Sequence, residues 1–283
     1  MDAALEAIRE QQKQSWNKFS AGWKKWDKVT MNFMLPVGEA IISALRPSGN
    51  DVVLDIAAGT GEPGLTIASM LDGGKVVITD LAEDMLTIAK ENATLRNIKN
   101  VDIISCDVCE LPFADDSFDA ISCRFGFMFF PDMQLAADEM IRVLKPGGKL
   151  SAAVWDGPEK NSWVTAIMGV INKNMQLPAP IPGAPGMFRC SQPAVMKNIF
   201  GKAGFENVTE EPVIGKLEVG TAEGYWSMMT EVAAPIVAAL GKADEAMQQR
   251  IKEEVYQIIH DNYAEGSVAI KAGSIVISAS KPV

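Results

Sequence analysis

The sequence predicts an α/β fold in which helices cover a mostly parallel sheet. Short β-branched runs alternate with helical segments between residues 52 and 154, a pattern that is typical of βαβ units. A glycine-rich turn follows the first of these runs, and a Pro-Gly-Gly turn precedes the last. The chain has 283 residues, of which 48% are hydrophobic and 22% charged, so it can bury a large core.

The alternating region contains five expected strands, each rich in β-branched or apolar residues. They are Val52–Ile56, Val76–Asp80, Val101–Ile104, Phe118–Cys123 and Lys149–Val154. Helices with one apolar face are expected at Gly64–Leu71, Ala82–Leu95 and Met133–Leu144. Pro146 and Gly147 then end the last helix and allow a turn with positive φ into the fifth strand.

The composition of the chain changes after Trp155. Proline and glycine crowd residues 178–186, a stretch too irregular for an ordinary connection, which suggests a functional loop or lid. A helix is expected to begin at Ser191 as its N-cap, with Pro193 in the first turn. Two further strands are expected at 208–217 and 267–278, with helical sequence between them at 222–263.

An N-terminal helix carries an aromatic stripe. Trp16, Phe19, Trp23 and Trp26 are spaced three, four and three residues apart, which places them on one helical face. Two interpretations fit this stripe. It docks the helix on the core, or it forms a lid over a pocket that binds a cation.

The charge balance excludes several classes of partner. Lys and Arg number 26 against 36 Asp and Glu, a net charge of −10, which disfavours a nucleic-acid substrate. No apolar run is long enough to span a bilayer, and the first residues are acidic and polar, so a cytoplasmic protein without a membrane span is expected. The oligomeric state is not predicted.

Four cysteines fit a reducing compartment without a disulfide framework. Cys106 and Cys109 form a C-x-x-C, but the chain has no second pair and a single histidine, His260. We therefore expect buried thiols there and no metal site.

A glycine-rich turn points to a nucleoside ligand. Gly59–Gly64 reads G-x-G-x-x-G after a strand and before a helix, and Asp80 ends the next strand. Glycines let the backbone approach a ligand closely, and a carboxylate at the second strand accepts from ribose hydroxyls. This motif alone fits NAD as well as other adenosine cofactors.

Two acidic residues and a set of motifs narrow the choice. A carboxylate at Asp55 favours a cationic ligand over a pyrophosphate, and Asp107 suits an exocyclic adenine amine. The other motifs are Asp55–Gly61, Leu111–Phe113, Asp116–Asp119, Arg124–Gly126 and Arg142–Gly148. Together they resemble the class I S-adenosylmethionine-dependent methyltransferases, in the small-molecule branch (methyltransferase type 11) that includes the ubiquinone/menaquinone C-methyltransferases. The resemblance extends from about Trp16 to Pro282.

The resemblance implies a Rossmann-like, doubly wound, seven-stranded sheet with an antiparallel last strand. It further implies a helical N-terminal lid at 1–35 and a methyltransferase domain at 36–283, with substrate-side insertions at about 156–200 and 220–265. The implied cofactor is S-adenosyl-L-methionine and the implied partner is a small-molecule substrate. Its expected contacts are Asp55, Ala57, Ala58, Gly59, Thr60 and Gly61 for the methionine end, Asp80 for the ribose, Leu81, Met85, Asp107 and Val108 for the adenine, and Arg124 and Phe125 beside the sulfonium.

Two residues depart from the family pattern. Ala57 stands where the broader class often has glycine and brings a methyl group toward the ligand. Arg124 stands where the quinone enzymes have a small polar residue, so the sequence does not predict a quinone acceptor.

An activated sulfonium methyl needs a well-placed nucleophile more than acid–base machinery. No catalytic residue is therefore assigned, and His260 and Tyr225 are the candidates for a general base, with Tyr256 and Asp156 as alternatives. A hydrophobic or aromatic acceptor is expected from the methionines and aromatics near the strand ends, although ordinary core packing also explains these residues. The expected substrate and lid residues are Phe19, Trp23, Met128, Trp155, Met187 and Trp226.

Three alternatives stay open. A nicotinamide-dependent oxidoreductase would share the glycine motif, although Asp55 argues against it. A methyltransferase-like module could hold the cofactor without turnover. Methylation of a metalloid through the cysteines ranks lowest, because Cys106 and Cys109 are expected near the adenine rather than the methyl group.

Overall fold

The computed structural model of the chain describes residues 3–178, 181 and 183–283. A seven-stranded sheet has the order β3-β2-β1-β4-β5-β7-β6, in which β1 to β5 are parallel. Strand β7 runs antiparallel to its neighbours β5 and β6, so the predicted fold class is confirmed. The strands are Val52–Ile56 (β1), Lys75–Asp80 (β2), Val101–Ser105 (β3), Phe118–Arg124 (β4), Leu144–Trp155 (β5), Glu206–Gly220 (β6) and Val268–Ser280 (β7).

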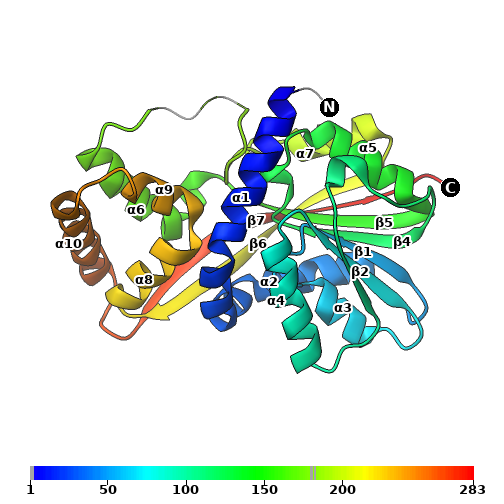
Figure 1. Ribbon diagram of the computed structural model, residues 1–283, viewed down its shortest axis with the longest axis horizontal. Coiled ribbons are helices and arrows are strands. Elements are labelled where there is room, and N and C mark those ends of the chain that lie inside the picture. Colours follow the sequence, from blue (N-terminus) through cyan, green and yellow to red (C-terminus); the bar gives the residue numbers. More distant parts are fainter. Residues whose placement is uncertain (1–2, 179–180, 182) are drawn as a thin grey trace.

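Helices cover both faces of the sheet (Figure 1). On one face, Val37, Leu65 and Leu86 pack against the strands in one buried cluster. On the other face, Met140 and Phe200 belong to a second, larger cluster. Burial on both faces explains why the central strands read as nearly continuous apolar runs. The helices are α2 (Asp27–Leu45), α3 (Gly64–Met70) and α4 (Glu83–Leu95) on the first face, and α5 (Met133–Val143) and α7 (Val195–Ala203) on the second.

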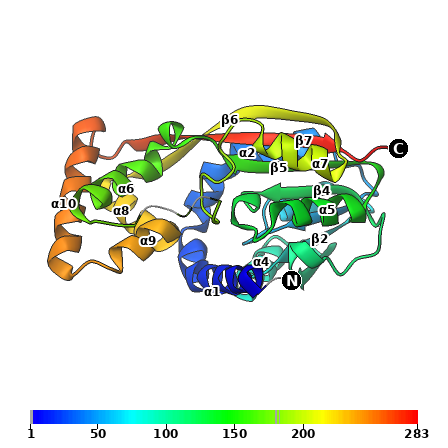
Figure 2. The same ribbon diagram turned by 90° about the horizontal axis from the view of Figure 1, so that it is seen from above.

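Four further helices form a cap at one end of the molecule. Figures 1 and 2 show them gathered beyond the sheet, where the long strands β6 and β7 lead toward them. Their apolar residues, such as Ile167, Met229 and Ile251, are buried in the larger cluster. The cap helices are α6 (Ser162–Asn174), α8 (Ala222–Val232), α9 (Ala234–Leu240) and α10 (Glu245–Asn262).

Helix α1 (Ala3–Lys25) crosses the molecule between the cap and the sheet (Figure 1). Phe19 is its buried residue. Salt bridges join the helix to α4 and to α8, among them Lys13 with Glu83 and Lys25 with Glu231. Because Phe19 is its buried residue and its salt bridges are exposed, α1 fits a cover over the cavity better than a core element. The boundary at residue 35 remains a prediction, and α2 runs without a break through that position.

Two predicted elements need correction. The helix expected from Ser191 begins at Val195, because Ala194 has left-handed backbone angles (φ 64°, ψ 2°) that a helix cannot include. Ser191 instead donates from its hydroxyl to the Phe188 carbonyl. The helical stretch predicted at 222–263 is divided into α8, α9 and α10. Part of the predicted irregular loop at 178–186, namely residues 179, 180 and 182, lies outside the described residues.

Candidate active site

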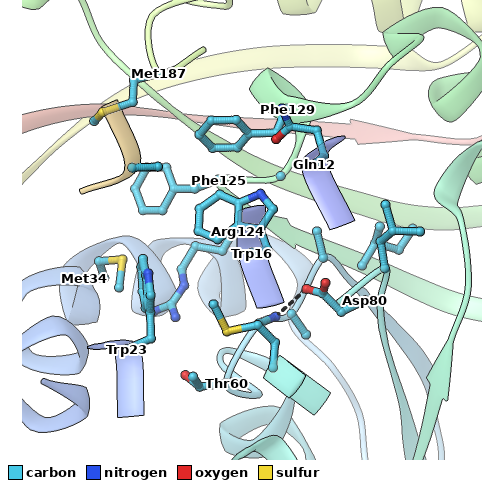
Figure 3. Close-up of a pocket in the computed structure, with 18 of the residues that line it drawn as sticks. Gln12, Trp16, Trp23, Met34, Thr60, Asp80, Arg124, Phe125, Phe129 and Met187 are labelled. Atoms are coloured by element: carbon cyan, nitrogen blue, oxygen red, sulfur yellow. Dashed lines mark hydrogen bonds between the residues drawn. The ribbon is translucent and has the colours of Figure 1, made fainter. Parts of the chain in front are cut away.

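A cavity opens at the C-terminal ends of β1, β2 and β4 (Figure 3). Strand order changes direction between β1 and β4, and in open α/β sheets ligands bind at such a point. The sheet loops form one wall of the cavity. Helix α1 and the cap supply the others, through residues such as Trp16, Trp23 and Met228. Three separate parts of the chain therefore meet around one space.

The glycine loop follows β1 and has an unusual backbone. Ala57, Gly59 and Gly61 all have positive φ, at 53°, 57° and 107°, which glycine adopts at least cost. A Cβ on Gly59 would meet no neighbour within 4 Å, so a side chain there would extend into space that the cavity needs. At Gly61 a Cβ would lie 2.7 Å from Leu65 Cδ1. Ala57, Ala58, Gly59 and Thr60 line the cavity, whereas Gly61 faces the core behind them.

Asp80 ties the glycine loop to β2. Its Oδ2 accepts from the Gly59 amide at 2.9 Å, and its Oδ1 accepts from the Ala82 amide at 2.8 Å. Burial raises the pKa of Asp80, against the effect of these backbone hydrogen bonds. Each carboxylate oxygen can accept more than one hydrogen bond, so Asp80, which lines the cavity, retains acceptor capacity for ribose hydroxyls.

Asp107 has a buried oxygen without a partner. Its Oδ1 caps the 3₁₀ turn η1 (Val108–Glu110) by accepting from the Cys109 amide at 2.9 Å. Its Oδ2 is buried and accepts no hydrogen bond, although Arg9 Nη1 lies 3.7 Å away. An unpartnered buried carboxylate oxygen carries a cost in free energy that a ligand donor would remove. Leu81, Met85 and Val108 line the cavity as well, so an apolar surface accompanies this acceptor.

Asp55 is placed differently from the prediction. It is fully buried and does not line the cavity. Its Oδ2 accepts from the Gly64 amide at 2.8 Å and its Oδ1 from the Ser122 hydroxyl at 2.7 Å. Burial raises the pKa of Asp55 to about 7. The carboxylate therefore supports the loop from behind and does not meet a ligand directly.

Aromatic rings form a second wall. Phe125 stacks on Trp155 with ring centroids 4.0 Å apart, and Trp155 lies 5.0 Å from Trp163. From the lid, Trp16 packs edge-on against Phe129 at 5.1 Å. These rings offer faces and edges that suit a cation or an apolar ligand.

Arg124 ends β4 and lines the cavity. Its guanidinium lies against α2, where Nη2 is 3.8 Å from Met31 Sδ. Burial lowers the pKa of Arg124, and Glu62, Asp55 and Asp27 act in the opposite direction. Within the described part of the chain, no carboxylate lies within the 4.0 Å of a salt bridge to this guanidinium.

Several predicted residues do not reach the cavity. Phe19 and Met128 are buried in the core, and Trp226 packs against it. The turn η2 (Phe127–Phe129) directs Met128 inward, so Phe129 lines the cavity in its place. On α8 the lining residues are Met228 and Val232. Trp226 precedes Met228 by two positions, which corresponds to about 200° around a helix. Trp23, Trp155 and Met187 line the cavity as predicted.

Neither candidate base reaches the cavity. The Tyr225 hydroxyl is fully buried and donates to the Trp163 carbonyl at 2.6 Å, and burial raises the pKa of this phenol. His260 is exposed on α10 with its ring edge-on to Tyr256. Of the alternatives, Tyr256 does not line the cavity, and Asp156 accepts from the Gly157 amide and Lys160. None of these four side chains lines the cavity, so none is placed to act as a general base there.

Sequence reasoning missed several lining residues, and one helical signal could have found Gln12. Gln12 and Trp16 lie four residues apart, and Trp23 follows one heptad after Trp16, so the three share a face of α1. All three line the cavity (Figure 3). Phe129 and Trp163 gave no such signal, because their orientation depends on the turn η2 and on the cap.

The cysteines of the C-x-x-C carry no disulfide. Cys106 lines the cavity, and burial raises its pKa to about 11. Burial likewise raises the pKa of Cys109 to about 12. Both thiols are therefore protonated near neutral pH and poor nucleophiles.

Comparisons with known proteins agree with this geometry. Residues 53–148 match a family model described as a methyltransferase domain. A demethylmenaquinone methyltransferase of Thermus thermophilus is 39% identical over 111 residues, which cover 39% of this chain and 50% of that protein. One of Listeria monocytogenes is 34% identical over 140 residues, 49% of this chain and 54% of that protein. The chain thus spans about half the length of the curated relatives it matches.

Solved structures share the fold over more of the chain. A candidate methyltransferase of Bacillus halodurans has a TM-score of 0.58 and 23% identity, covering 87% of this chain and 99% of that one. A phosphoethanolamine N-methyltransferase of Haemonchus contortus, solved with S-adenosylhomocysteine, has a TM-score of 0.57 and 20% identity, covering 93% of this chain and 58% of that one. In the described part of the chain, no helix is long and apolar enough to cross a bilayer.

Proposed function

We propose that this chain, which matches a methyltransferase domain over residues 53–148, is a class I S-adenosylmethionine-dependent methyltransferase that transfers a methyl group from S-adenosylmethionine to a small hydrophobic or aromatic molecule. One observation carries this proposal. The glycine loop, the Asp80 carboxylate and the unpartnered buried oxygen of Asp107 lie around one cavity. These groups match the needs of an adenosine ligand: close backbone approach, an acceptor for ribose hydroxyls and an acceptor for the adenine amine.

When bound, S-adenosylmethionine supplies an activated methyl group on a sulfonium. Phe125, Trp23 and Trp16 line the cavity, and a cation over the face of an aromatic ring is stabilised by about 0.5 to 2 kcal/mol. The lid and the cap exclude water and hold an acceptor in position. Orientation of this kind lowers a barrier by roughly 7 to 11 kcal/mol, so a positioned general base is not needed for every acceptor.

The cap side of the cavity indicates the acceptor class. Met187, Met228, Val232 and Pro235 line it, and their surfaces are apolar. Thioether side chains adapt to irregular apolar ligands. A hydrophobic or aromatic acceptor suits this lining. The chain has a net charge of −10, which would repel the phosphates of a nucleic acid, so a nucleic acid is a poorer candidate. We place this reaction in the cytoplasm.

Isothermal titration calorimetry with S-adenosylhomocysteine and with NAD tests the proposal on the wild type, on Asp80→Ala and on Asp102→Ala. Asp102 is an exposed residue paired with Lys75 and serves as the matched control. We expect S-adenosylhomocysteine to bind the wild type and the control equally. Asp80→Ala should lose about 1 to 3 kcal/mol of binding free energy. Binding of NAD in place of S-adenosylhomocysteine would overturn the proposal.

A further inference from the structure

Arg124 brings a cation into the cavity without a matching anion. The described chain provides it with no salt bridge, and its recorded hydrogen bond is the weak contact from Nη2 to Met31 Sδ at 3.8 Å. Buried charges are expensive unless they are paired. A guanidinium in this state is therefore suited to an anionic ligand, with which it can form two parallel hydrogen bonds.

A second donor without a partner lies beside it. Trp23 lines the cavity, and its Nε1 is buried and donates no hydrogen bond. Figure 3 shows the Trp23 indole and the Arg124 guanidinium side by side, on the far side of the cavity from Asp80. A guanidinium without a salt bridge and a buried indole N–H without a hydrogen bond together match a carboxylate.

Arg124 and Trp23 lie apart from the cap side of the cavity, where the methyl-accepting substrate is expected. Arg124 Nη1 lies near α2, 4.0 Å from where a Cβ on Gly38 would be, and Glu62 of the glycine loop is foremost among the charges that act on it. The cap side of the cavity, by contrast, carries apolar residues such as Met228 and Pro235. The cation thus lies on the α2 side of the cavity and not among the apolar cap residues.

An acceptor of opposite character lies close by. Asp27, in the first turn of α2, has a buried Oδ1 that accepts no hydrogen bond. Its carboxylate lies near Thr60 of the glycine loop, and its charge interacts with that of Arg124. Asp27 does not itself line the cavity, so its carboxylate acts on this end of the cavity through its charge and not through direct contact with a ligand.

We propose that Arg124 and the Trp23 indole N–H bind the α-carboxylate of the methionine part of S-adenosylmethionine. This inference rests on the proposed function. It revises the prediction that Arg124 lies simply beside the sulfonium, where two like charges would repel each other. Asp55 does not contribute to this contact, because its oxygens are already engaged by Gly64 and Ser122.

A pair of ligands tests this assignment. S-adenosylhomocysteine carries both the carboxylate and the ammonium, whereas its decarboxylated analogue, S-adenosyl-3-thiopropylamine, retains only the ammonium. Calorimetry measures both ligands on the wild type, Arg124→Met, Trp23→Phe and Arg250→Met. Arg250 is an exposed residue on α10 and controls for the loss of an arginine.

We expect Arg124→Met to weaken S-adenosylhomocysteine roughly 10- to 100-fold and to leave the analogue within about twofold. Trp23→Phe should show a smaller loss, again only for the ligand with the carboxylate, and Arg250→Met should show none.

Three outcomes would overturn the assignment. Equal weakening of both ligands by Arg124→Met would mean a structural role. Unchanged binding of both would mean that the arginine serves a carboxylate of the acceptor. A wild type that binds neither ligand would instead refute the proposed function itself.

Discussion

Asp55 shows how one buried carboxylate links the glycine loop to pH. Its pKa is raised from 3.8 to about 7, chiefly by burial. Between these values the folded chain retains a proton that the unfolded chain has lost. Stability therefore falls as the pH rises through this window, by up to about 1.4 kcal/mol per pH unit, and levels off above it.

The variant Asp55→Asn should lack this decline. An amide can accept from the Gly64 amide and donate to the Ser122 hydroxyl, and it does not titrate. We measure the unfolding free energy with urea from pH 5 to pH 8. The difference between the variant and the wild type should shift in favour of the variant as the pH rises. The exposed Asp102→Asn should follow the wild type, and parallel curves for all three proteins would contradict the role of Asp55.

Tyr225 permits a different prediction at the same scale. Its hydroxyl donates to the Trp163 carbonyl at 2.6 Å, so Tyr225→Phe removes this buried hydrogen bond at a cost of about 0.5 to 1.5 kcal/mol. We expect lower stability in urea unfolding but S-adenosylhomocysteine affinity within about twofold of the wild type. A large loss of affinity without a loss of stability would restore Tyr225 as a site residue.

These residues show which site positions a sequence can predict. Asp80 and the glycine loop were found because a strand, a turn and a helix follow each other locally. Asp55 was found too, but its orientation depends on Ser122 of β4, 67 positions away. Met128 was chosen over Phe129 because periodicity gives no phase for a three-residue turn such as η2.

The lid helix raises a question at the scale of elements: how closely α1 must approach α8. A Cβ on Gly22 would overlap the Glu231 carbonyl oxygen, so Gly22→Ala should push α1 away from the cap. We expect weaker S-adenosylhomocysteine binding in calorimetry and faster trypsin cleavage at the lysines of α1, because the ion pairs that join α1 to α4 and α8 are exposed and worth little each.

The control for this substitution is Gly169→Ala in α6, where a Cβ meets nothing within 4 Å. It should leave both the affinity and the cleavage rate unchanged, since alanine also suits a helix interior. If Gly22→Ala behaves in the same way, α1 does not need its close approach to α8 in order to cover the cavity.

At the scale of the whole molecule, the sheet could be predicted and the cap could not. The strands of the sheet depend on the local alternation that the sequence displays. The cap depends on where helices α6 and α8 to α10 fold back onto β6 and β7, segments up to about 100 residues apart in the chain. Periodicity reveals that such helices exist, but not which of their faces meet the cavity.

The cavity therefore joins three parts of the chain, and the cofactor should stabilise them unequally. At a concentration 100 times its Kd, a ligand adds about 2.7 kcal/mol to the unfolding free energy. Hydrogen exchange on the full chain with S-adenosylhomocysteine should show protection in α1 and in the loops at 57–62, 80–85 and 106–108. These segments carry Trp23, Asp80 and Asp107.

The cap segment 228–235 should gain little protection from S-adenosylhomocysteine, because its lining is apolar and faces the expected acceptor. The edge strand β6 at 206–214 provides an internal reference, since no residue of this segment lines the cavity. Equal protection of 228–235 and of the glycine loop would mean that the cofactor reaches the cap. The acceptor would then have to bind elsewhere, and the division of the cavity into a sheet side and a cap side would be wrong.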